Sequence, residues 1–380
     1  MSGTSLFPFA ELPESLVEQV LAKSERIGED LHKSLLKIKD AKKEMRRQLE
    51  EAKLLRKDVD LGETPVPTTC GIDGSFAVEK LLSMDLVACA AVAIEGLIPP
   101  SEKKSREKPD HQVFIRPEKH DAETGNLIRG LMAEMEIDLA ESSKNDVVFM
   151  DGSLGSRIIH LNQAFSKVRM PPETETEVAM VDGLYRLLKN YKKILESKAD
   201  AGQPEQQWVS VPKYTTRGEI GSRFNWPSDY DDRAIMTIIL TAGEFTTPVK
   251  LTSDKDNWHL KLPYPDEALE SLRDEIEKAM DGLRVMYYKP NTFSPAMRIE
   301  IPESVAMNDS RLAIVLCGLK YQCSNPAIFE PYPLYMADRM VKHLPSALPA
   351  FRQTATRKMA ELTDGDLTEI FFSMQSYRTE

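Results

Sequence analysis

The sequence lacks several features that would place it in a familiar class. Its cysteines, Cys70, Cys89, Cys317 and Cys323, form no CxxC pair, so the pattern favours free thiols in a reducing cytoplasm over a zinc or disulfide framework. No run of about eighteen apolar residues occurs, which argues against a membrane-spanning helix. The first residues also lack the basic and apolar regions of a signal peptide. We therefore expect a cytoplasmic protein with no membrane segment.

Basic residues are outnumbered by acidic ones. The 49 Lys and Arg residues stand against 60 Asp and Glu residues, which gives a net charge of −11. A broad basic face for nucleic acid is therefore not expected, and any such ligand would need a local groove or delivery by a partner. The apolar share of 41% is enough for a substantial core, so a disordered chain is excluded.

The first part of the chain reads as one long helix over residues 11–57, because apolar residues recur there at steps of three and four. Such a helix has to pack on another helix of the chain or on a second copy, so we read it as a helical arm or dimerisation element. Its basic residues alternate with acids, which fits a solvated face, and a nucleic-acid contact is the alternative. These basic residues are Lys39, Lys42, Lys43, Arg46 and Arg47.

After residue 65 the pattern alternates between strands and helices, which predicts an α/β fold with a central mixed sheet flanked by helices. The ends, 1–10 and 362–380, look loosely held. We expect a helical arm (1–65), a main domain (66–345) and a C-terminal tail (346–380). Predicted strands lie at 71–81, 86–98 (one strand or a pair), 113–115, 147–154, 208–212, 234–240, 283–288 and 297–301. Predicted helices lie at 126–142, 265–283, 312–319 and 334–343.

An Asp-Gly-Ser triplet follows an apolar run twice, in GIDGS at 71–75 and in FMDGS at 149–153. A carboxylate at the carboxyl end of a strand lies at the rim where open α/β sheets bind ligands. If the two strands are parallel neighbours, Asp73 and Asp151 are adjacent, and a divalent cation relieves their repulsion. Hard oxygen ligands favour Mg²⁺ or Mn²⁺. Asp-Gly is also an ordinary turn, so an unoccupied turn is the alternative.

The helix between the two triplets carries Glu134 and Glu136. Being two residues apart, they cannot share a face of a helix. Only one of them can reach a site beneath the helix, and a surface position is the alternative for either.

Two other enzyme classes begin with similar motifs. GIDGS resembles the first phosphate loop of sugar kinases and actin-like proteins, but no further glycine-rich loop follows residue 160. The phosphatase signature DxDG[ST] requires an earlier Asp, and Gly71 and Phe149 stand at that position. A phosphotransferase of the actin-like class is therefore a weaker alternative.

Several motifs occur in an order that resembles the NurA-type nucleases: GIDGS, MEIDLA, VVFMDGSL, VSVPKYTT, AGEFTTP, MRIEIP and PYPLYMADRMV. The resemblance runs from about residue 68 to residue 345. It implies an RNase H-like core, a metal-dependent nuclease that hydrolyses DNA, and Mn²⁺ (or Mg²⁺) as cofactor with two ions at the site. It also implies 5′–3′ exonuclease and single-strand endonuclease activity.

The resemblance assigns roles to individual residues. Asp73 and Asp151 correspond to the metal-binding aspartates, and Glu136 to the acid on the helix between them, with Glu134 as the alternative. The lysine after the second aspartate corresponds to Lys213, which would contact a phosphate or the attacking water.

The late motif contains Tyr332 and Asp338. We place Tyr332 with the substrate, together with Arg157 just after the second triplet. Asp338 stands where relatives carry a His or an acid. The fourth ligand is therefore either Asp338 or missing, with the second metal bound more loosely.

The same resemblance implies partners. It predicts a homodimer that acts beside a hexameric HerA-type DNA-translocating ATPase, in DNA end processing or in defence against phage. A catalytically weak scaffold that caps the translocase ring is the non-enzymatic alternative.

Overall fold

The computed structural model of the chain describes residues 12–97, 108–198, 205–213, 218–227, 230–251, 258–362 and 367–375. Its centre is a ten-stranded mixed sheet in the order β1-β7-β9-β10-β6-β5-β2-β3-β4, with β8 paired to β9. The strands are β1 (Leu55–Lys57), β2 (Thr69–Lys80), β3 (Asp85–Glu95), β4 (Asp110–Glu118), β5 (Val147–Asp151), β6 (Gln207–Val211), β7 (Glu244–Thr246), β8 (Val249–Lys250), β9 (Arg284–Tyr288) and β10 (Met297–Ile301).

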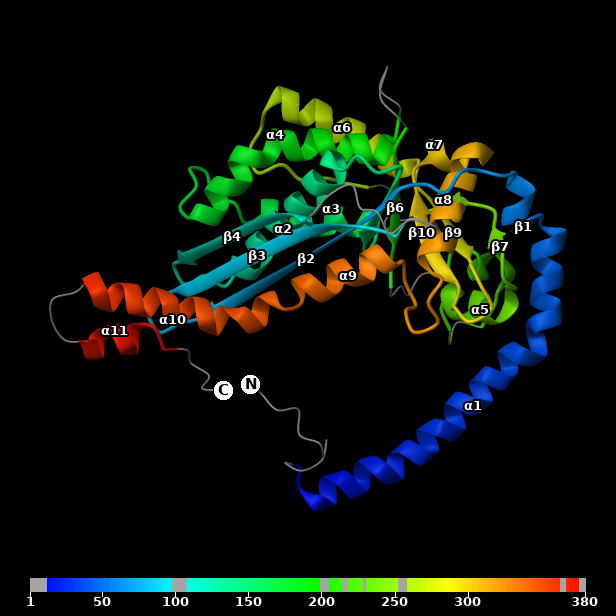
Figure 1. The fold of residues 1–380 in the computed structure, drawn as a ribbon, viewed down its shortest axis with the longest axis horizontal. Helices are drawn as coiled ribbons and strands as arrows, with labels where there is room; N and C mark the ends of the chain where they lie inside the picture. Colours follow the sequence, from blue (N-terminus) through cyan, green and yellow to red (C-terminus); the bar gives the residue numbers. More distant parts are fainter. Residues whose placement is uncertain are drawn as a thin grey trace.

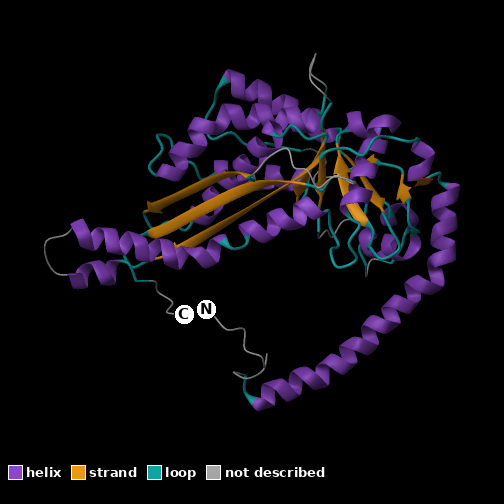
Figure 2. Ribbon diagram, viewed as in Figure 1, coloured by secondary structure: helices purple, strands orange, loops and turns teal. Residues whose placement is uncertain are grey.

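Helices cover both faces of this sheet (Figures 1 and 2). The predicted mixed α/β architecture with a long N-terminal helix is therefore confirmed. The α-helices are α1 (Glu14–Glu51), α2 (Thr124–Ser142), α3 (Leu154–Phe165), α4 (Glu175–Glu196), α5 (Asp232–Ile239), α6 (Glu267–Asp281), α7 (Glu303–Ala306), α8 (Asp309–Gln322), α9 (Tyr332–Val341), α10 (Leu344–Leu362) and α11 (Leu367–Ser373). The described residues also include the 3₁₀ helices η1 (Asp58–Leu61) and η2 (Gly221–Phe224).

The middle of the sheet is parallel. β5 pairs in parallel with β2 on one side and with β6 on the other. Every residue from Val147 to Met150 is buried, as expected for a parallel strand covered by helices on both faces. The connection between β2 and β5 includes the β3–β4 hairpin and α2, which is the crossover that parallel neighbours require.

Two apolar layers hold the helices on the sheet. One layer includes Ile72, Leu131 and Leu184 and lies between the sheet and α2, α3 and α4. The other includes Phe149, Leu316 and Leu334 and lies between the sheet and α8 and α9. Because β5 contributes to both layers, its carboxyl end is fixed from both sides.

The long helix α1 is packed only in its second half. Ile38, Met45 and Leu49 are buried, whereas Ile27 and Leu31 are 57% and 61% exposed. At about 1.5 Å per residue the helix is about 57 Å long, and its first half projects away from the sheet (Figure 1). The predicted arm is therefore present, although shorter than the range 11–57.

Some predicted elements differ from the structure. The segment 234–240 was expected as a strand, but all of it except Leu240 belongs to helix α5. The Asp231 side chain accepts a hydrogen bond from the backbone N–H of Ala234 and caps this helix. The strand expected at 113–115 extends over Asp110–Glu118. Helices α3 and α4 were not predicted.

The residues after 345 are more ordered than expected. Leu348 of α10 and Met374, which follows α11, pack against Leu81, Leu86 and Ala88 of the β2–β3 hairpin. The loosely held end predicted from residue 362 onward is therefore wrong for 367–375, while the end predicted at 1–10 lies outside the described residues. Among the described helices, none is both long and apolar enough to span a bilayer.

Candidate metal centre

The parallel pairing of β2 and β5 brings the two aspartates together. Thr69 to Ile72 are paired with Val147 to Met150 in register, so Asp73 and Asp151 are the next residues on the two strands. Asp151 ends β5, as predicted. Asp73 does not end its strand, because β2 continues to Lys80 along β3. Asp73 nevertheless belongs to the site, because β5 ends at Asp151, which is the residue next to Asp73 on the neighbouring strand.

The two Asp-Gly-Ser triplets have different local structures. At the second triplet Gly152 has a φ of +70°, and Ser153 caps α3 by accepting a hydrogen bond from the N–H of Gly155. Gly74 instead lies within β2, where an added Cβ would be 2.7 Å from Oε1 of Glu136. The ordinary Asp-Gly turn, considered above as the alternative, is therefore wrong for Gly74. That glycine makes room for the glutamate.

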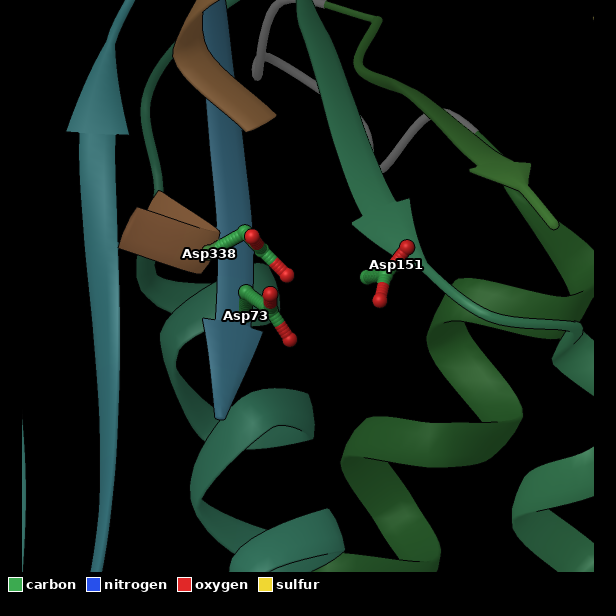
Figure 3. Close-up of side chains that lie close together, drawn as sticks. All are labelled: Asp73, Asp151 and Asp338. Atoms are coloured by element: carbon green, nitrogen blue, oxygen red, sulfur yellow. The ribbon is translucent and has the colours of Figure 1, made fainter. Parts of the chain in front are cut away.

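A third aspartate comes from helix α9. The start of this helix lies directly on β2, since a Cβ at Gly71 would overlap the backbone of Pro333 and Leu334. This close packing brings Asp338 to the two strand aspartates (Figure 3). One carboxylate oxygen from each of Asp73, Asp151 and Asp338 lies within 4.8 Å of the others. Three separate elements therefore supply oxygen atoms to one point.

The two glutamates of α2 point to different neighbours. Oε2 of Glu136 accepts a hydrogen bond of 3.1 Å from Arg157, and the negative charge of Glu136 contributes to raising the pKa of Asp73. Oε1 of Glu134 accepts one of 2.9 Å from Arg186 of α4. Both glutamates are buried, so the surface alternative is wrong, and Glu136 is the one on the side of the aspartates.

The site is unfavourable for negative charge without a cation. Burial, followed by repulsion from Asp151 and Glu136, raises the pKa of Asp73 to about 9. Burial also raises the pKa of Glu136 to about 7, although Arg157 opposes this. Oδ1 of Asp151 is buried and accepts no hydrogen bond from the described residues. These oxygen donors fit a hard divalent cation such as Mn²⁺ or Mg²⁺.

Lys213 follows β6 by two residues and extends into the acidic site. Its Nζ lies 3.6 Å from Oδ1 of Asp151, 3.2 Å from Oε2 of Glu330 and 3.0 Å from Oδ1 of Asp338. Burial alone would lower the pKa of Lys213, but these three carboxylates raise it above the usual lysine range. Sequence reasoning missed Glu330, although it stands two residues before Tyr332 in the late motif.

Arg157 lies inside the site rather than at its surface. Its side chain is 3% exposed, and Nη2 donates to the backbone oxygen of Asp151 (2.9 Å) and to Glu136 (3.1 Å). The substrate contact expected of Arg157 would require an accessible guanidinium. In the structure this group instead connects Glu136 with the backbone of Asp151. Tyr332, the first residue of α9, is half-buried.

A buried charge network supports the turn after Asp151. Oε2 of Glu300 accepts hydrogen bonds from Oγ of Ser153 (2.6 Å) and from the N–H of Leu154 (3.1 Å). Arg298, 1% exposed, donates to Oε1 of Glu300 and pairs with Glu219. Sequence reasoning gave these residues no role. The feature that could have indicated a buried charge network is the Arg and the Glu inside the otherwise apolar strand MRIEI.

These features define a class: α/β proteins with a carboxylate centre on two adjacent parallel strands, at the point where one of them ends. The family model of the NurA domain matches residues 67–343. This chain therefore belongs to the NurA family. No curated protein matches it.

Solved structures agree on the fold. The chain is similar to the NurA nuclease from Sulfolobus solfataricus, with a TM-score of 0.60, 14% identity, and coverage of 93% of this chain and 99% of that one. A structure described as NurA with manganese has a TM-score of 0.53 and 12% identity, with coverage of 88% and 98%. At these identities the likeness establishes the fold alone.

Proposed function

We propose that this chain is a metal-dependent DNA nuclease that hydrolyses phosphodiester bonds with two divalent cations. The observation that carries the proposal is the meeting of Asp73, Asp151 and Asp338, whose oxygen atoms lie within 4.8 Å of one another. Membership of the NurA family supports the nuclease class. The manganese named for a structurally similar NurA supports Mn²⁺, with Mg²⁺ as the substitute.

Asp73 and Asp151 are the central ligands in this proposal, with Glu136 completing the site and Asp338 as the fourth carboxylate. Bound cations would activate a water and stabilise the departing oxygen. Arg157 keeps Glu136 in place while remaining buried. Lys213 and Tyr332 would contact the DNA, and Lys213 suits a phosphate because its ammonium is a compact positive charge.

The wider setting rests on the family resemblance. We propose 5′–3′ exonuclease and single-strand endonuclease activity, a cytoplasmic location, and action beside a HerA-type hexameric ATPase in DNA end processing or phage defence. A net charge of −11 fits a protein to which DNA is delivered. Residues 1–65 would form the dimerisation arm, 66–345 the nuclease domain and 346–380 a C-terminal tail.

A cleavage assay on end-labelled DNA tests the proposal. We expect Mn²⁺- or Mg²⁺-dependent cleavage by the wild type, and a loss of at least about 100-fold in Asp73→Asn and Asp151→Asn, because each change removes a charged ligand. Glu136→Gln should also lose activity. Glu134→Gln is the matched control, since this glutamate lies on the same helix but faces α4.

The assay also separates the enzyme from a scaffold. Cleavage that persists in both Asp variants would place the chemistry elsewhere. If the folded wild type binds Mn²⁺ but cleaves only when the ATPase is added, the enzyme depends on its partner. Absence of cleavage under both conditions would favour the scaffold.

A further inference from the structure

The ammonium group of Lys213 lies within the acidic site, close to oxygen atoms from three segments. Asp151 ends β5, Glu330 precedes α9, and Asp338 lies within α9. The distances from Nζ to their oxygens run from 3.0 to 3.6 Å. A compact positive charge surrounded by three carboxylates has the environment that proteins provide for a bound cation.

Two of these carboxylates also belong to the metal centre. Asp151 and Asp338 form the group of three with Asp73 and, at the same time, contact Lys213. Two-cation centres hold their ions about 3.5–4 Å apart. Asp151 and Asp338 are therefore shared between the group of three aspartates and the contacts of the lysine.

The charges at the site balance with one divalent cation. Five acidic side chains face three basic ones, which leaves two negative charges in excess when all are ionised. The acids are Asp73, Glu136, Asp151, Glu330 and Asp338, and the basic residues are Arg157, Lys213 and Lys342. A second divalent ion beside the lysine would meet a positive charge at short range.

We propose that the Lys213 ammonium occupies the second cation position in the DNA-free protein, so that the free chain binds one divalent ion tightly. This inference rests on the metal-dependent nuclease function proposed above. It gives Lys213 a role before the substrate arrives, in addition to the proposed phosphate contact. Glu330 then becomes a ligand of the second position, which opens only when the lysine leaves.

The test is the number of Mn²⁺ ions bound by the full chain without DNA, measured by calorimetric titration and by electron paramagnetic resonance. We expect one ion in the wild type and two in Lys213→Met, which keeps an unbranched side chain one atom shorter and removes its charge. The two ions in the variant share Asp151, so their spectrum should show exchange coupling that the wild type lacks. Lys213→Arg, which retains the charge, should stay at one.

The matched control is Lys342→Met. Lys342 also pairs with Asp338, at 2.6 Å, but its side chain is 68% exposed and belongs to the solvent-facing edge of the site. The Lys342→Met variant should still bind one Mn²⁺ ion. This result would show that the position of Lys213, and not only the loss of one positive charge, determines the number of ions.

The outcomes separate this inference from the proposed function. Two ions in the DNA-free wild type, or one ion in a folded Lys213→Met, would overturn the inference while the nuclease function stands. If Lys213→Met does not fold, the wild type and Lys213→Arg still test the inference. Two bound ions or exchange coupling in either protein would overturn it. A wild type that binds no Mn²⁺ would contradict the proposed function itself.

Discussion

The charge of Asp73 destabilises the folded protein when no metal is bound. The pKa of Asp73 is raised to about 9 in the folded chain, against about 3.9 for an unperturbed Asp. Between these values the folded state holds more protons than the unfolded state. The free energy of unfolding therefore falls as the pH rises, because ionisation is opposed only in the folded protein.

We therefore expect the Tm of the metal-free protein to decrease from pH 5 to pH 9. Each kcal/mol lost should lower Tm by about 1 °C in a chain of this size, because the entropy of unfolding grows with chain length. Asp73→Asn should flatten this slope, and excess Mn²⁺ should raise the wild-type Tm most at high pH. The measurement is thermal unfolding in a chelating buffer across this range. A wild-type slope equal to that of the Asn variant would show that Asp73 ionises freely.

Each of the two glutamates of α2 pairs with an arginine of another helix. Glu136 pairs with Arg157 of α3, and Glu134 pairs with Arg186 of α4. Arg157→Met should weaken Mn²⁺ binding by about 10–100-fold, the usual effect of losing a residue that orients a ligand. Arg186→Met should change Mn²⁺ binding by less than about two-fold, because Arg186 is 62% exposed and pairs with Glu134 and Asp138, which are not in the group of three aspartates. Titration of both variants with Mn²⁺ checks this, and equal losses would contradict it.

At the scale of elements, the site depends on how closely α9 approaches β2. A methyl group at Gly71 would overlap the backbone of Pro333 and Leu334, which pushes away the helix that carries Asp338. We expect Gly71→Ala to reduce the free energy of unfolding by about 1–3 kcal/mol and to weaken Mn²⁺ binding. Denaturant unfolding measures the first effect.

Gly125→Ala is the control for this substitution. A Cβ at Gly125 meets nothing within 4 Å, and the position lies at the start of α2. The free energy of unfolding should therefore change little. If Gly71→Ala were as stable as Gly125→Ala, the contact between α9 and β2 would be looser than the structure indicates.

Some elements of the structure are predictable from the sequence, and others are not. The adjacency of Asp73 and Asp151 was predictable, because two apolar runs with a crossover helix between them favour parallel neighbours. Helix α5 was not, since a short apolar run such as AIMTII fits a buried strand or a helix equally well. Glu330 and Glu300 carry no spacing signal, because tertiary packing alone brings them to the site.

At the scale of the whole molecule, the exposed half of α1 is the feature that a single chain leaves unexplained. Leu16, Val20, Ile27 and Leu31 are between 43% and 61% exposed and follow a helical spacing. Burying an apolar side chain of this kind contributes about 1.5–3 kcal/mol. This supports the proposed role of the arm in a homodimer.

The double variant Ile27→Asp with Leu31→Asp should therefore shift the protein from dimer to monomer, since two charges would be buried without partners in the interface. Light scattering after size-exclusion chromatography measures the mass. The fold should survive, because the packed part of the helix begins near Ile38. Met307→Asp, at a position 76% exposed on another surface, should leave the mass unchanged. If the wild type is a monomer, or if the double variant remains a dimer, the arm is not the dimer interface, and its apolar face must serve a different partner.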